Sequence, residues 1–315
     1  MDVVAKTVKE IRALKIQGAS NIRKKAVNAL LWASEKSKAK TTSAFRLEFL
    51  KHASILYSSR PTEPELRTSL RIIKKSISNK DLSVKEMKEN IKIAVKKYET
   101  NRLKAINDIS IFGANLIENG SVVMTICHSS TVIEMLTKAK KKIKKVYCLE
   151  TRPLYQGRIT AKELAKAGLN VTLLVDNAAS TVMKECDYLF SGADAFLADG
   201  DVINKIGTNQ VSYLCKRYDV KHYAVASTHK FEPATFFGKQ EPIEQRSPDE
   251  IWSEKEKKKF GAKKVKINNP AFDRTDSKTL EGIICEIGVF SPQTLAARLY
   301  EELDLKKHEK EFLKL

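Results

Sequence analysis

The first third of the chain carries apolar residues at helical spacing. Val4, Val8 and Ile11 fall three to four residues apart, so they form one face of a helix. Thr62, followed by Pro64 and two acidic residues, is typical of a capped helix start. The helices predicted in this way cover residues 3–14, 22–30, 47–56 and 83–111, with another beginning at residue 64. The pattern predicts an N-terminal helical domain of residues 1–115.

The pattern of apolar and polar positions changes near residue 115. Short runs of apolar and β-branched residues then alternate with helical stretches, which is typical of a parallel sheet. The predicted strands are residues 121–126, 145–149, 170–175, 187–191 and 221–226. The predicted helices between them are residues 130–139, 160–167, 178–185 and 208–217. We therefore expect an α/β fold, in which the helical domain is followed by a Rossmann-like, doubly wound parallel sheet domain of residues 116–315.

Charge and cysteine content narrow the choice of partners. The chain has 57 Lys and Arg residues against 38 Asp and Glu residues, a net charge of +19. This surplus of positive charge has three interpretations: binding of a polyanion, a solvated lysine-rich surface, or a basic cleft that attracts a small anionic substrate. The sequence has no zinc-finger or RNA-recognition motif, so we expect no specific nucleic-acid partner. Five cysteines, none in a CxxC pair, suit a reducing compartment rather than a disulfide framework.

Several other classes are disfavoured. No apolar run is long enough to cross a membrane, and the N-terminus has no apolar signal core, so we expect a cytoplasmic protein without a membrane partner. Neither a GxGxxG nor a GxxxxGK[ST] motif is present. His and carboxylate residues are not clustered at metal-ligand spacing. We expect no cofactor and no metal.

A doubly wound sheet binds ligands at the carboxyl ends of its strands, so the residues after each strand are the first candidates. Cys127 follows the first predicted strand, and Ser129 and Ser130 begin the next helix. A helix N-terminus lowers the pKa of a nearby thiol and binds phosphate through backbone N–H groups. We therefore expect Cys127 to be a reactive thiol. Four other cysteines are expected to be buried and inert: Cys148, Cys186, Cys215 and Cys285. Of these, Cys148 is expected inside a strand, and Cys186 and Cys215 are expected inside helices.

Charged and amide side chains follow the other predicted strands. Arg152 follows the second strand, and Asp194 is placed as a catalytic carboxylate after the fourth. Asn204 and Lys205 precede a helix, and Lys230 follows the fifth strand. A thiol, a carboxylate and several cations indicate acid/base or nucleophilic chemistry on a phosphorylated small molecule.

Two further features have ordinary structural interpretations. Asp199 and Asp201 flank a glycine and are interpreted as turn residues. His229 is interpreted as a packing or hydrogen-bonding residue rather than a base.

Longer motifs then follow one another along nearly the whole chain. They are CHSS at 127–130, ETRPLYQGRITAKELAKAG at 150–168, GADAFLADGDVINKIGTNQ at 192–210 and ASTHKFEPAT at 226–235. The chain resembles the superfamily that contains ribose-1,5-bisphosphate isomerase, methylthioribose-1-phosphate isomerase and the regulatory subunits of translation initiation factor 2B. The ETRPxxQGxxTAxEL pattern is most similar to the archaeal bisphosphate isomerases.

This resemblance implies conversion of ribose 1,5-bisphosphate to ribulose 1,5-bisphosphate, through an enol-phosphate, in AMP salvage. Cys127 and Asp194 stand where the isomerases carry a Cys and an Asp that transfer protons. The resemblance also implies a homo-oligomer, a dimer or a hexamer. Positions implied as substrate contacts are Gln17, Gly18, Ala19, Ser20, Arg60, Ser129, Arg152, Gln156, Gly157, Asn204, Lys205 and Lys230.

Two alternatives stay open at this point. A non-catalytic regulatory subunit of the initiation factor 2B type would bind nucleotide or sugar phosphate and dock on initiation factor 2. Isomerisation of methylthioribose 1-phosphate would need an apolar pocket in place of a second phosphate site, and the cations at Arg60, Arg152, Lys205 and Lys230 favour two phosphates.

Overall fold

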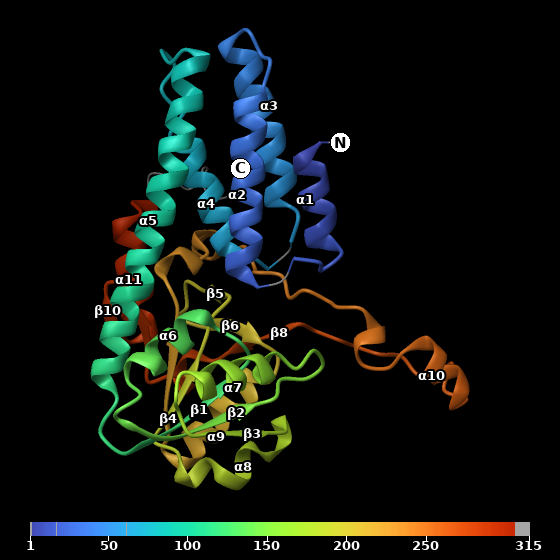
Figure 1. Ribbon diagram of the computed structural model, residues 1–315, viewed down its shortest axis with the longest axis vertical. Helices are drawn as coiled ribbons and strands as arrows, with labels where there is room; N and C mark the ends of the chain where they lie inside the picture. The colour runs from blue at the N-terminus through green and yellow to red at the C-terminus, as the bar shows by residue number, and fades with distance from the viewer. Residues whose placement is uncertain (1, 17, 61, 306–315) are drawn as a thin grey trace.

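The computed structural model describes residues 2–16, 18–60 and 62–305, so Gln17 lies outside the described residues. The described chain begins with long helices that pack side by side and stand above the rest of the molecule (Figure 1). These helices are α1 (Val3–Arg12), α2 (Ala19–Lys36), α3 (Thr42–Tyr57), α4 (Pro64–Lys75) and α5 (Val84–Leu116). The predicted helical N-terminal part is confirmed.

Two details of this region differ from the prediction. The N-cap of α4 is Glu63 rather than Thr62, because the Thr62 hydroxyl donates instead to the carbonyl of Pro242. Helix α5 begins with a capping box between Ser83 and Glu86 and runs for 33 residues, about 50 Å. Its first half packs in the core of the helices and its second half against the sheet. The domain boundary predicted at residue 115 stays a prediction.

A seven-stranded sheet forms the centre of the second part. Its order is β10-β9-β7-β4-β1-β2-β3, and every pairing is parallel except the antiparallel pair of β10 with β9. The strands are β1 (Ser121–Ile126), β2 (Ile143–Leu149), β3 (Val171–Leu174), β4 (Tyr188–Ser191), β7 (Lys221–Val225), β9 (Gly282–Cys285) and β10 (Gly288–Phe290). The predicted parallel sheet is confirmed, and β9 and β10 were not predicted.

Helices cover both faces of this sheet. Val123 of β1 packs with α5 and α6 on one face, while Met124 packs with α8 and α9 on the other. This alternation is the doubly wound arrangement. The covering helices are α6 (Ser130–Lys138), α7 (Gln156–Lys166), α8 (Ala179–Val182), α9 (Thr208–Tyr218) and α11 (Pro292–Glu302).

The helix predicted at residues 178–185 was wrong in detail. This stretch divides into the 3-10 turn η1 (Asp176–Ala178), the short α8 and a second turn, η2 (Met183–Glu185). Cys186 lies after η2 with an extended backbone, so it is not inside a helix. It is nevertheless buried, as are Cys148, Cys215 and Cys285.

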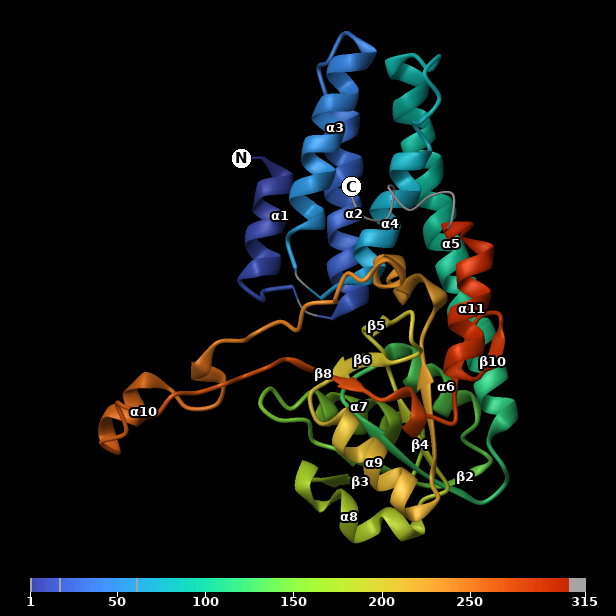
Figure 2. The ribbon, with the colours of Figure 1, turned by 180° about the vertical axis from the view of Figure 1, so that it is seen from behind.

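A second, antiparallel sheet and a projecting arm were also missed. The small sheet has the order β5-β6-β8, built from β5 (Ala195–Phe196), β6 (Val202–Lys205) and β8 (Phe272–Thr275). Between β7 and β8 lie the turns η3 (Thr228–Lys230), η4 (Pro233–Phe237) and η5 (Pro248–Glu250), followed by helix α10 (Glu254–Lys259). The turn η6 (Ser277–Thr279) follows β8. The arm that carries α10 extends away from the body in both views (Figures 1 and 2).

Buried ion pairs join α4 to the segment after β7. The guanidinium of Arg67, whose side chain is 7% exposed, donates to Glu232 at 2.7 Å and to Glu241 at 2.5 Å. Arg71 lies 3.5 Å from Glu232. These contacts hold the helical part above the carboxyl ends of the strands. None of the helices in the described residues is both long and apolar enough to cross a membrane.

We predict that Arg67→Met lowers the free energy of unfolding by about 3–5 kcal/mol, because Glu232 and Glu241 would be buried without a cation. The matched control is Arg298→Met, since Arg298 is 47% exposed and pairs with exposed Glu302. That change should cost less than about 1 kcal/mol. Urea unfolding of both variants measures the difference, and equal losses would contradict this account of α4.

Candidate active site

The strand ends bring the residues after β1, β2 and β4 to one edge of the sheet. Ile126 pairs in register with Leu149 and with Ser191, so Cys127 and Gly192 begin the loops at the same level. A Cβ on Gly192 would lie 3.0 Å from the Cβ of Ser129 and 3.8 Å from Oδ1 of Asn204. Gly192 therefore lets the loop after β1 and strand β6 approach each other closely.

The backbone of Cys127 is held in an unusual conformation. Its φ of 66° lies in the left-handed region, which for a residue with a side chain costs about 1–3 kcal/mol and is typical of functional sites. Its N–H donates to the hydroxyl of Thr151 at 2.9 Å, and its carbonyl accepts from the hydroxyl of Thr160 at 2.7 Å. The two threonines fix the direction in which the thiol points.

The expected lowering of the Cys127 pKa is wrong. Burial raises the pKa of this thiol to about 11, although the charge of Lys205 and the N–H of His128 lower it. The charges of Asp194 and Asp176 raise it further. Helix α6 begins at Ser130 with Ser129 as its N-cap, so Cys127 precedes the first turn of the helix. The effect of the helix dipole is strongest within that first turn and is weaker at Cys127.

The loop after β2 is fixed by a carboxylate that was not singled out from the sequence. Asp176 accepts the backbone N–H groups of Thr151 and Arg152, each at 2.7 Å. The exposed guanidinium of Arg152 donates to the hydroxyl of Tyr155 at 2.6 Å. Arg152 therefore holds an exposed cation beside Tyr155 at the rim of the site.

Helix α7 starts directly against the end of β2. Gln156 is its first residue, and the structure records no hydrogen-bond partner for its buried Oε1 among the described residues. A Cβ on Gly157 would stand 1.7 Å from the carbonyl oxygen of Leu149. Only glycine allows this approach, so the role of Gly157 in the fold is to bring Gln156 to the strand ends.

Asp194 and three cations lie in the same region as Cys127. Lys230 of η3 donates to the carbonyl of Ala193, next to Asp194. The charges of Lys205 and Asp194 act on the Cys127 thiol, and the charge of Asp194 acts on Arg60. These interactions bring together Cys127, Asp194, Arg60, Lys205 and Lys230, whose roles stay predictions.

Two of these cations lie near the same aromatic ring. The guanidinium of Arg60 lies 5.9 Å and the ammonium of Lys205 lies 4.9 Å from the ring centre of Phe272. Arg60 also donates to Glu244 at 2.9 Å. Asn204 is buried and donates to the hydroxyl of Thr208 at 3.0 Å.

The N-terminus of α2 carries the remaining predicted contacts. Gly18 is its N-cap with a φ of 80°, and Ala19 is its first residue. The hydroxyl of Ser20 accepts from Arg102, which also pairs with Glu65 at 3.0 Å. No interaction of Gly18, Ala19 or Ser20 with the cluster around Cys127 is recorded among the described residues.

Some nearby acidic groups are structural. Asp273 accepts the N–H groups of Gly207 and Asn209 at the start of α9, and burial raises its pKa to about 6. This carboxylate therefore occupies the N-terminus of α9. Asp199 lies in a turn, as predicted, and pairs with Arg274.

Asp201 and His229 also have structural partners. Asp201 pairs with Arg274 at 2.6 Å, so both turn carboxylates share one cation. The ring of His229 stacks on Tyr98 with centres 5.0 Å apart, as expected of a packing residue.

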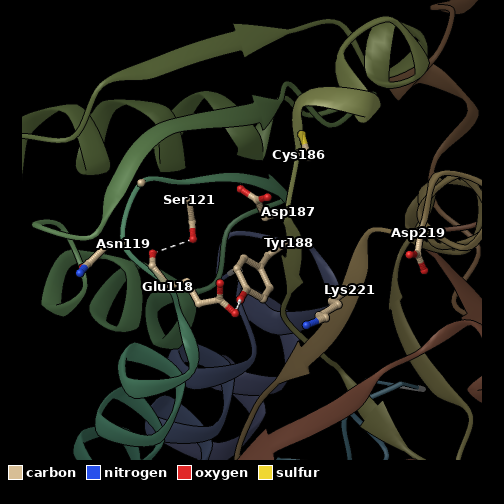
Figure 3. A pocket seen from close by; sticks show the side chains of 9 residues that line it. Glu118, Asn119, Ser121, Cys186, Asp187, Tyr188, Asp219 and Lys221 are labelled. Carbon is tan, nitrogen blue, oxygen red and sulfur yellow. Dashed lines mark hydrogen bonds between the residues drawn. The ribbon is translucent and has the colours of Figure 1, made fainter.

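A separate hollow of about 300 Å³ lies at the amino ends of the strands (Figure 3). Ser121 begins β1, Tyr188 begins β4 and Lys221 begins β7, and these residues line it with Glu118 and Asp187. It is at the opposite edge of the sheet from Cys127. The thiol, the carboxylate and the cations lie at the carboxyl edge, so the hollow is not the candidate site.

A doubly wound sheet with a thiol, a carboxylate and cations at the carboxyl ends of its strands defines an α/β protein with a candidate acid/base site. The model of the initiation factor 2 subunit family matches residues 15–292. This chain therefore belongs to the initiation factor 2 subunit family.

Relatives and solved structures extend over almost the whole chain. A ribose 1,5-bisphosphate isomerase of Thermococcus kodakarensis is 38% identical over 304 residues, which cover 95% of this chain and 94% of the relative. The 5-methylthioribose 1-phosphate isomerase of Pyrococcus horikoshii OT3 matches with a TM-score of 0.76 and 30% identity, covering 95% and 88% of the two chains. The translation initiation factor eIF-2B of Pyrococcus horikoshii OT3 matches with a TM-score of 0.76 and 26% identity, covering 93% and 98%.

We predict that Cys127 reacts with iodoacetamide slowly at pH 7 and about tenfold faster for each unit of pH up to about 10, because only the thiolate reacts. Mass spectrometry of the Cys127 peptide measures the rate. Cys127→Ser is the control for the other cysteines, which should stay unlabelled because they are buried. A rate that levels off below pH 9 would contradict the raised pKa.

Proposed function

We propose that this chain is an aldose–ketose isomerase that converts ribose 1,5-bisphosphate to ribulose 1,5-bisphosphate. The observation that carries the proposal is the meeting of Cys127, Asp194 and Lys205 at the carboxyl ends of β1, β4 and β6. The near-full-length similarity to the Thermococcus kodakarensis isomerase supports this choice of substrate.

In the first half of the proposed reaction, Asp194 donates a proton to the ring oxygen as the bond from C1 to that oxygen breaks. The Cys127 thiolate removes the proton from C2, and the electron pair forms the C1–C2 double bond of an enol-phosphate. The sugar is then open, the carboxyl is ionised and the thiol is protonated. General acid and base groups in this arrangement each contribute about 10²–10⁴-fold to rate.

In the second half, the protons return to new positions. The Cys127 thiol gives its proton to C1, and Asp194 accepts the proton of the C2 hydroxyl as the ketone forms. Both groups end in the state in which they began, so the cycle needs no oxidant, reductant or cofactor.

The raised pKa of Cys127 places a requirement on this mechanism. In the ligand-free site the thiol holds its proton at neutral pH, so the thiolate forms only in a minority of molecules. The charge of Lys205 lowers the thiol pKa, and this cation is therefore important to both phosphate binding and thiolate formation.

The two phosphates would be bound by cations on different elements. Lys205 and Lys230 approach from β6 and η3, and Arg60 approaches from the loop before α4. Arg152 at the rim, with Ser129, Gln156, Gly157 and Asn204, would complete the contacts. The N-terminus of α2, with Gln17, Gly18, Ala19 and Ser20, is proposed as a further contact.

A second candidate is a regulatory subunit that binds sugar phosphate or nucleotide without turnover and docks on initiation factor 2. The similarity to the eIF-2B structure of Pyrococcus horikoshii OT3 favours it, because that match covers 98% of the other chain.

We also propose four further properties: homo-oligomerisation, a division into domains near residue 115, a cytoplasmic location and a role in AMP salvage.

We predict that Cys127→Ser and Asp194→Asn each lower kcat for ribose 1,5-bisphosphate by at least about 10²-fold, because each variant loses one proton-transfer group. Formation of ribulose 1,5-bisphosphate by purified protein measures this effect. Methylthioribose 1-phosphate should be a poor substrate, because it leaves one set of cations without a phosphate.

The matched controls lie at the opposite edge of the sheet, where Cys186 and Asp219 line the hollow of Figure 3. Cys186→Ser and Asp219→Asn should keep wild-type kcat. Wild-type protein that binds ribose 1,5-bisphosphate without turnover would favour the regulatory subunit. Turnover that survives both Cys127→Ser and Asp194→Asn would contradict the assigned pair.

A further inference from the structure

Glu63 is a buried carboxyl without a full set of partners. Its residue is 2% exposed, and Oε1 has no hydrogen-bond partner among the described residues. Its Oε2 lies 3.8 Å from the guanidinium of Arg60, beyond hydrogen-bond distance. Although Glu63 is the N-cap of α4, its side chain does not cap the helix. One oxygen of this buried carboxyl therefore has no hydrogen-bond partner within the described residues.

The charged groups that act on Glu63 come from four elements. Arg60 lies in the same loop, Lys230 belongs to η3, Asp194 follows β4, and Glu65 is the second residue of α4. Three of these groups are the candidate catalytic carboxylate and two candidate phosphate-binding cations. Glu63 thus belongs to the wall of the candidate site.

Glu65 provides an internal comparison. It is also buried, but it lies 3.1 Å from Arg23 and 3.0 Å from Arg102. Burial alone would raise the pKa of Glu65, and the charges of Lys230, Arg102 and Arg23 lower it instead. Burial raises the pKa of Glu63 to about 8, Asp194 adds to the rise, and Arg60 and Lys230 oppose it without offsetting it. Two buried glutamates in one turn are thus opposite in charge state at neutral pH.

The state of Glu63 changes what the wall offers to an anion. Glu65 is paired with Arg23 and Arg102, and Arg60 is paired with Glu244. When Glu63 is protonated, its carboxyl can donate a hydrogen bond to a phosphate oxygen. When Glu63 is ionised, a phosphate oxygen would meet one more buried negative charge.

We infer that Glu63 is a specificity-determining residue whose protonated carboxyl binds a phosphate of the sugar substrate and whose ionised form rejects it. This inference rests on the proposed isomerase function. It implies that Glu63 carries a proton when the substrate is bound. It concerns substrate binding and assigns Glu63 no step in the proton transfer at C1 and C2.

The first test is the pH profile of wild type and Glu63→Gln between pH 6.5 and 9.5, with ribose 1,5-bisphosphate as substrate. Gln is close in shape to a protonated Glu and can also donate. For wild type, KM should rise about tenfold for each pH unit above 8, since only the protonated fraction binds. For Glu63→Gln, KM should stay nearly constant. The phosphate groups themselves, with a second pKa of about 6, are already ionised over the decisive range.

Glu65→Gln is the matched control. It removes a paired carboxylate, so it should lower stability at neutral pH but keep the alkaline rise of KM. A rise that disappears in both variants, or persists unchanged in Glu63→Gln, would overturn the inference. Wild type without any turnover would instead count against the proposed isomerase, so the two failures are distinguishable.

Two measurements do not depend on turnover. Calorimetry in buffers of different ionisation enthalpy should find uptake of about one proton when ribulose 1,5-bisphosphate binds wild type at pH 9, and almost none at pH 7. Folded Glu63 keeps its proton up to about pH 8, whereas an unfolded Glu loses it near 4.5. Wild type should therefore lose stability relative to Glu63→Gln as the pH rises between these values. No proton uptake, or no relative loss of stability, would overturn the inference.

Discussion

The candidate site depends on the pairing of charges buried between helix α4 and the carboxyl edge of the sheet. An unpaired buried charge costs several kcal/mol, so each charged group there needs a partner of the opposite sign. Arg67 has Glu232 and Glu241 of the segment after β7, and Glu65 has Arg23 of α2 and Arg102 of α5. The Arg67 pairs join α4 to the segment after β7, and the Glu65 pairs join α4 to its neighbouring helices.

The same constraint explains the protonation of buried groups whose charge is not fully paired. The thiol of Cys127 is partly buried near two carboxylates, so it keeps its proton, and Glu63 keeps its proton for a similar reason. A site that holds protonated groups beside Lys205 and Lys230 favours the entry of an anion. The cations and the protonated side chains both lower the negative charge of the site, so an anionic substrate fits it better than a neutral one.

The sequence was most informative where local pattern determines structure. The strand at Ser121–Ile126 matches its predicted bounds, because five apolar or β-branched residues follow Ser121 between a turn and a helix cap. The small sheet was missed because β5 has only two residues and β8 joins β6 from about 70 positions away. Such pairings leave no periodic signal in the sequence.

The site could be predicted in part for the same reason. Cys127 and Asp194 follow strands, and the parallel fold brings strand ends together whatever the side chains are. Thr151 and Thr160 hold the backbone of Cys127 from positions 24 and 33 residues further along the chain, and local sequence pattern does not reveal such contacts. The thiol pKa was predicted in the wrong direction because burial outweighs a helix dipole that lies one turn away.

The most direct measurement is turnover of ribose 1,5-bisphosphate that carries deuterium at C2. The account predicts ribulose 1,5-bisphosphate with part of the deuterium at C1, because one buried thiol removes and returns the proton, and slower turnover than with the unlabelled substrate. Absence of product, or unlabelled product formed at an unchanged rate, would contradict a proton shift through Cys127.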